Sequence, residues 1–483
     1  MNGPTEVPEY GQPDNRTADA RAADEARAAD QVARMMERLQ DPGRRRDYLR
    51  QLRDRRNQGR PDERIEVVEV DERSGEEPDD GDPPDGGPPE GFRPGEYLVD
   101  DYELITTTDA VEDAQFQAVL DDLGWERAPL RDDERRLEDR IARLRCLERP
   151  AWGVEEELRR FRAQTQHAVT LSYVVAFGAV MKGGETPTDT SAPSPQRPAP
   201  TNCHDVPIAV LDTGIAFQVR RDHWLMDLLR EGEEDRLDVL PPPEDGFLDA
   251  GAGHGSFVAG IVQQIVPDAR IKVYQVLDTD GLASETRVGD MMVGAVDEML
   301  DVDGCLILNL SLGTDTIDDQ PPLSFIAALD KIEAIAGNRS GEVLLVAAAG
   351  NDGTARPNWP AAFGRTRGWV VGVAALDPQL AGAFFSSRGD WVRCSTVGIG
   401  IRSTFVQGKE APEFATTQPP KVWGPDSWGQ WFGTSFAAPQ VAAAVAKHAV
   451  AQPATTPRLA AALAQLLGRG SPLQDFGVAV RIL

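Results

Sequence analysis

The sequence predicts an α/β fold over residues 206–483, with a mostly parallel sheet covered by helices on both faces. Two observations support this prediction: short apolar runs alternate with segments of helical spacing, and the runs are apolar almost without interruption. Strands of that kind are typical of parallel sheets, because both faces of such sheets are buried. The apolar runs lie at 208–211, 271–277, 306–312, 343–349 and 369–375, and the helical segments at 255–265, 287–299 and 323–336.

The chain before this domain begins with a charged extension and an acidic linker. Residues 1–60 have helix-forming composition, and the part from 44 to 56 is strongly basic. That basic part fits docking on an acidic partner or on nucleic acid, but a solvated helix face is the more common explanation, and we favour it. Residues 61–91 are acidic and rich in Pro and Gly, which predicts a flexible linker.

A small α+β module is expected over residues 92–181. Order is expected to resume at Gly95. A helix is predicted over 109–123 from its spacing of apolar residues, then charged helical sequence over 131–161 and a strand over 168–175. Residues 182–205 are rich in Pro, Thr and Ser and are expected to form a second linker. We therefore expect a prodomain-like module between two disordered segments.

Composition argues against several classes of protein. The formal net charge of −29 argues against general nucleic-acid binding. The four cysteines lack C-x-x-C spacing and predict reduced thiols rather than a disulfide framework or a zinc site. The first residues do not resemble a signal peptide, and the longest apolar run, 168–181, is too short to span a bilayer. We expect a soluble, cytoplasmic protein without nucleic-acid or membrane partners.

Two candidate catalytic residues lie where ligands gather in parallel sheets, beyond the carboxyl ends of strands. Asp212 directly follows a predicted strand, where a rigid carboxylate suits the orientation of an imidazole; an Asx turn explains it about equally well. His254 opens a predicted helix within a glycine-rich stretch. A lone histidine is more often structural, so neither residue is decisive by itself.

Asn351 and Ser435 extend this set. Asn351 follows the predicted strand at 343–349, and its amide is a neutral donor suited to a developing oxyanion, although a turn asparagine is the simpler explanation. Ser435 precedes a helix of small residues at 437–449. Backbone N–H groups at a helix N-terminus lack intrahelical partners, so a nucleophile there carries an oxyanion donor in its own backbone. An N-cap on an alanine-rich core helix is the alternative.

The motifs around these four residues resemble those of the subtilisin family of serine peptidases, from about residue 206 to the C-terminus. The motifs are Asp212-Thr-Gly, His254-Gly-Ser-Phe-Val-Ala-Gly, Ala349-Gly-Asn and Gly433-Thr-Ser-Phe-Ala-Ala-Pro. The resemblance implies that Ser435 is the nucleophile, His254 the general base and then acid, and Asp212 the group that fixes the imidazole tautomer. The Asn351 side chain and the Ser435 backbone N–H would form the oxyanion hole.

The same resemblance implies a peptide-binding cleft. A substrate would bind as an added strand along one edge segment. That segment and a second one would together form the walls of the main specificity pocket. The residues concerned are Leu310, Ser311, Leu312 and Gly313, and then Ala348, Ala349 and Gly350. No cofactor or metal ligand is expected, and the structural calcium of the family is not assigned to residues.

Some residues depart from the family pattern without removing a catalytic group. Ser256 and Phe257 stand where the family usually has Thr-His, and Phe436 stands where Met is common. We therefore expect an active enzyme.

Two interpretations of function follow. The first is a serine endopeptidase, made as a zymogen, which acts on protein or peptide substrates. The module at 92–181 would then be an inhibitory prodomain released by a cut within 182–202, or else an independent interaction domain. The second is a catalytically silent scaffold that binds regulatory partners. In both, residues 1–60 are expected to bind a partner or to regulate.

Overall fold

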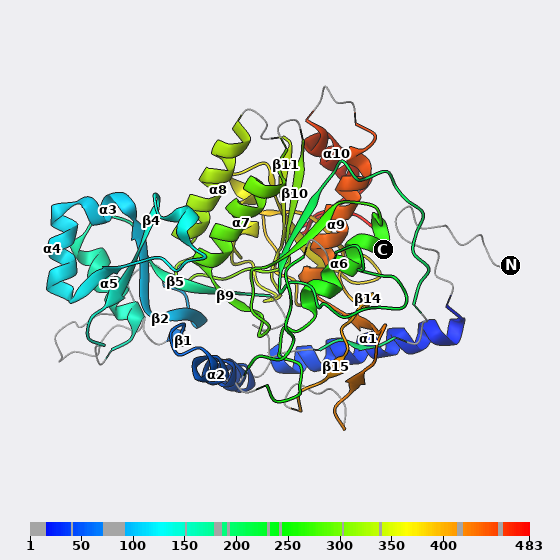
Figure 1. The fold of residues 1–483 in the computed structure, drawn as a ribbon, viewed down its shortest axis with the longest axis horizontal. Helices are drawn as coiled ribbons and strands as arrows, with labels where there is room; N and C mark the ends of the chain where they lie inside the picture. Colours follow the sequence, from blue (N-terminus) through cyan, green and yellow to red (C-terminus); the bar gives the residue numbers. More distant parts are fainter. Residues whose placement is uncertain are drawn as a thin grey trace.

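The structure is a computed structural model. It describes residues 16–39, 42–70, 92–149, 152–177, 186–190, 194–228, 232–240, 244–301, 304–337, 341–412, 419–452 and 457–483. An α/β unit and a smaller module lie side by side, and two N-terminal helices run along both (Figure 1).

An eight-stranded sheet forms the centre of the α/β unit, in the order β18-β19-β13-β12-β11-β10-β7-β8. All neighbouring strands from β19 to β8 are parallel, which confirms the predicted fold class; only β18, at one edge, is antiparallel. The strands are β7 (Ile208–Asp212), β8 (Ile271–Gln275), β10 (Leu306–Leu310), β11 (Val343–Ala348), β12 (Val370–Leu376), β13 (Val392–Val397), β18 (Ser471–Leu473) and β19 (Gly477–Ala479).

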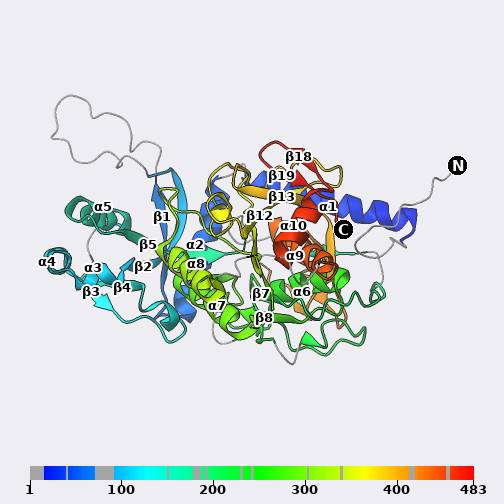
Figure 2. The same ribbon diagram turned by 90° about the horizontal axis from the view of Figure 1, so that it is seen from above.

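Helices cover both faces of this sheet (Figure 2). Helices α7 and α8 pack on one face, whereas α6 and α9 pack on the other, with α10 against α9. In α9 every residue except Lys447 is buried, because its alanines let the helix lie close to the strands. The helices are α6 (His254–Ile265), α7 (Glu285–Met299), α8 (Leu323–Ala336), α9 (Thr434–Ala449), α10 (Arg458–Leu467) and the short η6 (Ala361–Arg365).

A second sheet, largely antiparallel, forms the core of the module, in the order β3-β4-β2-β5-β9 with β1 paired to β2. Helices α3, α4 and α5 of the module pack against this sheet. Helices α7 and α8 of the α/β unit also contact it, at β5, β2 and β4. The elements are β1 (Ile65–Val70), β2 (Gly95–Thr107), α3 (Thr108–Glu112), α4 (Ala114–Leu123), β3 (Trp125–Ala128), η2 (Arg135–Leu137), β4 (Ile141–Cys146), α5 (Val154–Gln164), β5 (Val169–Ala176) and β9 (Leu282–Ser284). Because β9 belongs to the α/β unit, the two parts share one sheet.

The module differs from the sequence expectations at two strands. Strand β1 lies inside 61–91, which we expected to be a flexible linker; it pairs with β2 and buries Ile65 and Val68. Strand β4 lies inside 131–161, which we expected to be helical. In β4 the buried apolar side chains pack against the core, and these tertiary contacts override the helical propensity of the charged residues. Residues 71–91 lie outside the described part of the chain.

The two N-terminal helices, α1 (Ala18–Leu39) and α2 (Pro42–Gly59), contact different parts of the molecule. Helix α2 packs on β1, and α1 packs on a small sheet of order β14-β17-β6. Strand β6 falls within 182–205, so part of that expected linker is a paired strand. The remaining strands are β6 (Thr188–Asp189), β14 (Ile401–Thr404), β15 (Gly408–Lys409), β16 (Val422–Trp423) and β17 (Trp428–Trp431).

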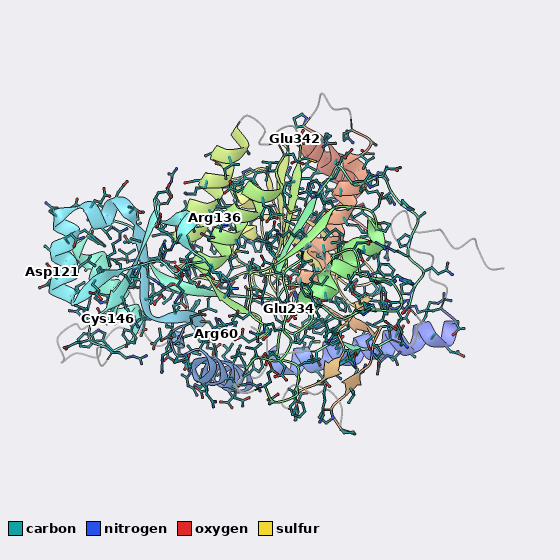
Figure 3. All side chains as sticks on the ribbon, viewed as in Figure 1. Arg60, Asp121, Arg136, Cys146, Glu234 and Glu342 are labelled. Carbon is teal, nitrogen blue, oxygen red and sulfur yellow. The ribbon has the colours of Figure 1, made fainter. Side chains whose placement is uncertain are left out.

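The basic helix α2 is not simply a solvated face, contrary to the interpretation that we favoured. The Arg56 guanidinium is only 4% exposed and donates hydrogen bonds to Asp280 (2.8 and 3.0 Å) and Asp278 (3.1 Å). Arg60, just beyond the helix, also donates to Asp278 (2.9 Å; Figure 3). Acidic residues of the α/β unit therefore bind this end of the extension. No helix in the ranges given above is both long enough and apolar enough to cross a bilayer.

Candidate active site

Asp212 and His254 meet at the carboxyl edge of the large sheet. Asp212 ends β7, His254 begins α6, and both side chains are fully buried. Oδ1 of Asp212 lies 2.6 Å from Nδ1 of His254 and also accepts a hydrogen bond from the Thr213 N–H (2.8 Å). A carboxylate at Nδ1 leaves Nε2 as the ring nitrogen that can take a proton from another group.

Glycines bring these two elements together. Gly253 has a φ of +80°, in the left-handed region, immediately before His254. A Cβ on Gly255 would lie 2.1 Å from the carbonyl oxygen of Gly214. Helix α6 therefore begins closer to the end of β7 than any side chain at position 255 would permit.

Ser435 lies in the first turn of α9 and is held by Ser311. Its Oγ donates to the Ser311 carbonyl (3.1 Å). Pro439 has no N–H to offer to the Ser435 carbonyl four residues earlier, and that carbonyl accepts from Ser311 Oγ instead (2.7 Å). The ring of the next residue, Phe436, lies 5.3 Å from the His254 ring, measured between centroids.

The hydrogen bond between nucleophile and base is not formed in this structure. Nε2 of His254 has no hydrogen-bond partner among the residues that the structure describes. Such bonds are often absent or long until a substrate is bound, so the observed arrangement is compatible with a catalytic pair.

Gly433 and Asn351 lie next to the start of α9, where Ser435 is located. Gly433 has φ +147° and ψ 160°, a region that is essentially restricted to glycine. Oδ1 of Asn351 accepts hydrogen bonds from the N–H and the Oγ1 of Thr434, both at 2.9 Å. A Cβ on Gly433 would lie 3.3 Å from Nδ2 of Asn351. The amide donor is thus fixed next to the start of α9, where it can stabilise a negative oxygen.

The residues expected to bind substrate lie at the same edge of the sheet. Leu310 ends β10 and Ala348 ends β11, and the expected residues that follow each strand are buried beside them. Gly350 has a φ of +95°, and a Cβ on Gly313 would lie 2.0 Å from Oδ1 of Asn358. The structure therefore brings both predicted segments to the sheet edge at which β7 ends in Asp212.

The module's own chain lies in this cleft. Strand β5 pairs antiparallel with β9, and Ala176 and Gly313 exchange two hydrogen bonds (3.1 and 2.9 Å). Phe177, the next residue, is 1% exposed and stacks on His254 with ring centroids 4.2 Å apart. After residues 178–185 the described chain resumes at Thr186 and pairs through β6 with β17, the strand that leads to Gly433. The chain is thus bound as extended strands at two places, on β9 and Gly313 before residue 178 and on β17 after residue 185.

Several residues at the site were not predicted from the sequence. Asp235 is buried and accepts hydrogen bonds from Thr213 Oγ1 (3.0 Å) and the Gly253 N–H (2.8 Å), which ties the end of β7 to the start of α6. Burial raises the pKa of Asp235 to about 7. Trp431 packs edge-on against the His254 ring at 5.6 Å. Neither residue lies in a recognised motif, so only the three-dimensional contacts reveal them.

The described part of the chain holds no group of three or more His, Cys, Asp and Glu side chains arranged for a metal ion. The four cysteines are free thiols.

The arrangement agrees with comparisons to known proteins. The model of the subtilase family matches residues 204–469. The minor extracellular protease Epr of Bacillus subtilis is 34% identical over 178 residues, which cover 34% of this chain and 24% of that protein. The thermostable alkaline protease of Halalkalibacterium halodurans is 30% identical over 207 residues, which cover 41% of this chain and 49% of that protein. Thermitase of Thermoactinomyces vulgaris is 29% identical over 208 residues, which cover 41% of this chain and 64% of that protein. The chain spans less than two thirds of the length of each of these three relatives.

Proposed function

The chain belongs to the subtilase family, and from this premise we propose that it is a serine endopeptidase that cleaves protein or peptide substrates through an acyl-enzyme. The observation that carries the proposal is the buried Asp212–His254 pair, which lies at the same sheet edge as Ser435 and Asn351. All four belong to motifs of the family, and the related proteins named above are proteases.

The proposed reaction begins when Ser435 Oγ exchanges its contact with the Ser311 carbonyl for Nε2 of His254. Oγ then attacks the substrate carbonyl while Nε2 takes its proton, and Asp212 stabilises the imidazolium. The Asn351 amide and the Ser435 N–H donate to the oxyanion. His254 next gives the proton to the leaving amine, and a water molecule activated by the same nitrogen hydrolyses the acyl-enzyme.

A silent scaffold is the alternative, and the comparisons do not favour it, because the relatives named above are proteases. A fluorophosphonate probe separates the two, because it reacts only with an activated serine. We expect the probe to label Ser435 and to leave the Ser435→Ala variant unlabelled. An unlabelled Ser435 in the native chain would favour the scaffold.

We also propose that residues 92–181 act as an inhibitory prodomain. The β5–β9 pairing, the Ala176–Gly313 bonds and the Phe177–His254 stack place this segment where a substrate would bind. Because the chain is paired with the α/β unit before residue 178 and after residue 185, we propose that the cut falls within 178–185. That window overlaps only the first part of the 182–202 window that the composition suggested.

The extension adds a second point of control in this proposal. Arg56 binds Asp278 and Asp280 in the loop that leads into β9, the strand on which the prodomain lies. A regulatory partner that withdraws α2 would loosen that strand. The cytoplasmic location stays a prediction.

A further inference from the structure

Phe177 occupies a closed aromatic site beside the general base. One face of its ring stacks on the His254 imidazole, with centroids 4.2 Å apart and planes at 30°. Its second aromatic neighbour is Trp431, edge to face at 6.3 Å and 78°. Both arrangements are geometries that aromatic pairs prefer. The side chain at this point of the chain is therefore held by ring contacts on two sides.

The walls of this site are fixed by the core rather than by Phe177. Trp431 is 1% exposed and packs on Phe257 (5.5 Å) and Phe436 (5.1 Å). Its backbone pairs with Ile401 of β14. Its indole N–H finds no acceptor within the described ranges, so the ring is kept in place by packing alone. The site therefore persists when the chain segment leaves the cleft.

The register of the bound strand decides which substrate side chain enters the site. Ala176 makes both of its backbone hydrogen bonds to Gly313, and the next side chain falls on His254. Any peptide that adds to the same edge with the same bonds presents the corresponding side chain there, because strand register fixes the direction of each side chain. Since His254 must reach the reacting serine, the cut follows within a residue or two.

Resting on the proposed function, we infer that the His254 face and Trp431 form a specificity subsite for an aromatic side chain. Substrates with Phe or Tyr at the position of Phe177 are preferred. An alanine there leaves the ring faces without contacts, and a charged side chain loses its water without gaining a partner.

The test uses the full-length protein and peptides with the sequence of residues 171–181. The position of Phe177 is varied to Tyr, Leu, Ala or Asp, and Ser435 is titrated with a fluorophosphonate in the same preparation. We expect kcat/KM for the Phe peptide to exceed that for the Ala peptide by roughly tenfold or more, with Tyr close to Phe. The protein's own segment at Phe177 competes with every peptide and lowers all rates by the same factor. The quantity compared is therefore the ratio of kcat/KM for the Phe peptide to kcat/KM for the Ala peptide.

Variants at Trp431 attribute the preference to this site. Trp431→Leu should bring the Phe-to-Ala ratio close to unity, and Trp431→Phe should keep most of it. The control is Trp428→Leu on the same strand, because Trp428 packs on Trp224 (5.2 Å) instead; its ratio should match the native one. If protein with a reactive Ser435 hydrolyses the Phe and Ala peptides equally, the inferred subsite is wrong. The proposed function is unaffected by that result. An unreactive Ser435 overturns both.

Discussion

Ser435 owes its position to contacts that no single motif describes. The Ser311 carbonyl accepts a hydrogen bond from the Ser435 hydroxyl, and the Ser311 hydroxyl donates one to the Ser435 carbonyl. The Ser435 carbonyl is available because Pro439 has no N–H. Gly433 turns the chain into α9 through a conformation that other residues rarely adopt. Ser435, the proposed nucleophile, is thus positioned by Pro439, Gly433 and Ser311.

Gly433→Ala tests this dependence. We expect it to destabilise the folded protein by roughly 1–3 kcal/mol, because alanine is strained at this φ and its Cβ meets the Asn351 amide. Gly424→Ala is the matched control, since nothing lies within 4 Å of a Cβ at that position; its effect should stay within about 0.5 kcal/mol. Denaturant unfolding measures both. Equal stabilities would show that the Gly433 conformation is not required.

Asn351→Ala tests the oxyanion side of the site. We expect kcat on a peptide substrate to fall by roughly 10²–10³ with little change in KM, because the amide binds charge that develops only in the transition state. Asn351 also accepts from Thr434, so the melting temperature is measured alongside. A folded variant with a loss below about threefold would contradict the assigned role.

The four motif residues could be predicted from the sequence because each follows a strand or opens a helix in a sheet whose type was evident. Asp235 and Trp431 could not. They act through Thr213 and His254, and these contacts depend on how loops fold back across the sheet edge. A buried carboxyl or indole has no local pattern that separates it from an exposed one.

At the scale of elements, short strands form several of the contacts that connect the N-terminal half of the chain to the α/β unit. Strand β9 has three residues and β6 has two, too few for residue periodicity to predict a strand. Strand β9 nevertheless pairs with β5 of the module, and β6 pairs with β17. Strands β7, β8, β10, β11 and β12 of the large sheet were predicted because they lie in largely apolar runs. Strand β13 was missed because Arg393, Ser395 and Thr396 interrupt its apolar residues. β1 was missed because it lies within an acidic segment and gains its stability only by pairing with β2.

Arg56→Ala tests the attachment of α2. The change leaves Asp280 buried without its cation, a loss on the order of 3–5 kcal/mol for a buried pair. Arg53→Ala on the same helix is the control, because its partners Asp54 and Glu66 are 68% and 32% exposed and such pairs contribute about 0–1 kcal/mol. Both are made in Ser435→Ala protein to prevent self-cleavage.

Hydrogen exchange over residues 42–59 is the measurement. We expect much faster exchange in the Arg56 variant and native exchange in the Arg53 variant. Similar exchange in the two would mean that the acidic loop does not hold the extension.

At the scale of the whole molecule, the module and the α/β unit meet around buried carboxyl groups. Glu134 of the module accepts hydrogen bonds from Ser284 and Thr286 at the start of α7 (2.9 and 2.5 Å). Burial raises the pKa of Asp100 to about 7 and that of Glu285 well above its usual value. Asp100 and Glu285 are thus stabilised in their protonated forms in the folded protein.

Stability should therefore fall as pH rises from about 4 to about 7. In that range the folded protein binds a proton at Asp100 that the unfolded chain, with a pKa near 3.9, has lost. Arg131 opposes this shift, whereas Glu103 and Glu134 add to it. Asp100→Asn keeps an acceptor for the Ser172 hydroxyl (2.6 Å) and cannot ionise. We expect its melting temperature to exceed the native one near pH 8 and to match it near pH 4. A difference that does not change with pH would contradict the assignment.

The most direct test of the account is the intact mass of the purified native chain beside that of Ser435→Ala. If Ser435 acts on the strand that the molecule holds in its own cleft, the variant keeps the full 52.5 kDa and the native protein gives two fragments. The new amino terminus should fall at a bond within residues 178–185. Identical masses for the two proteins, or a cut at the same bond in the variant, would contradict a peptidase that processes its own chain.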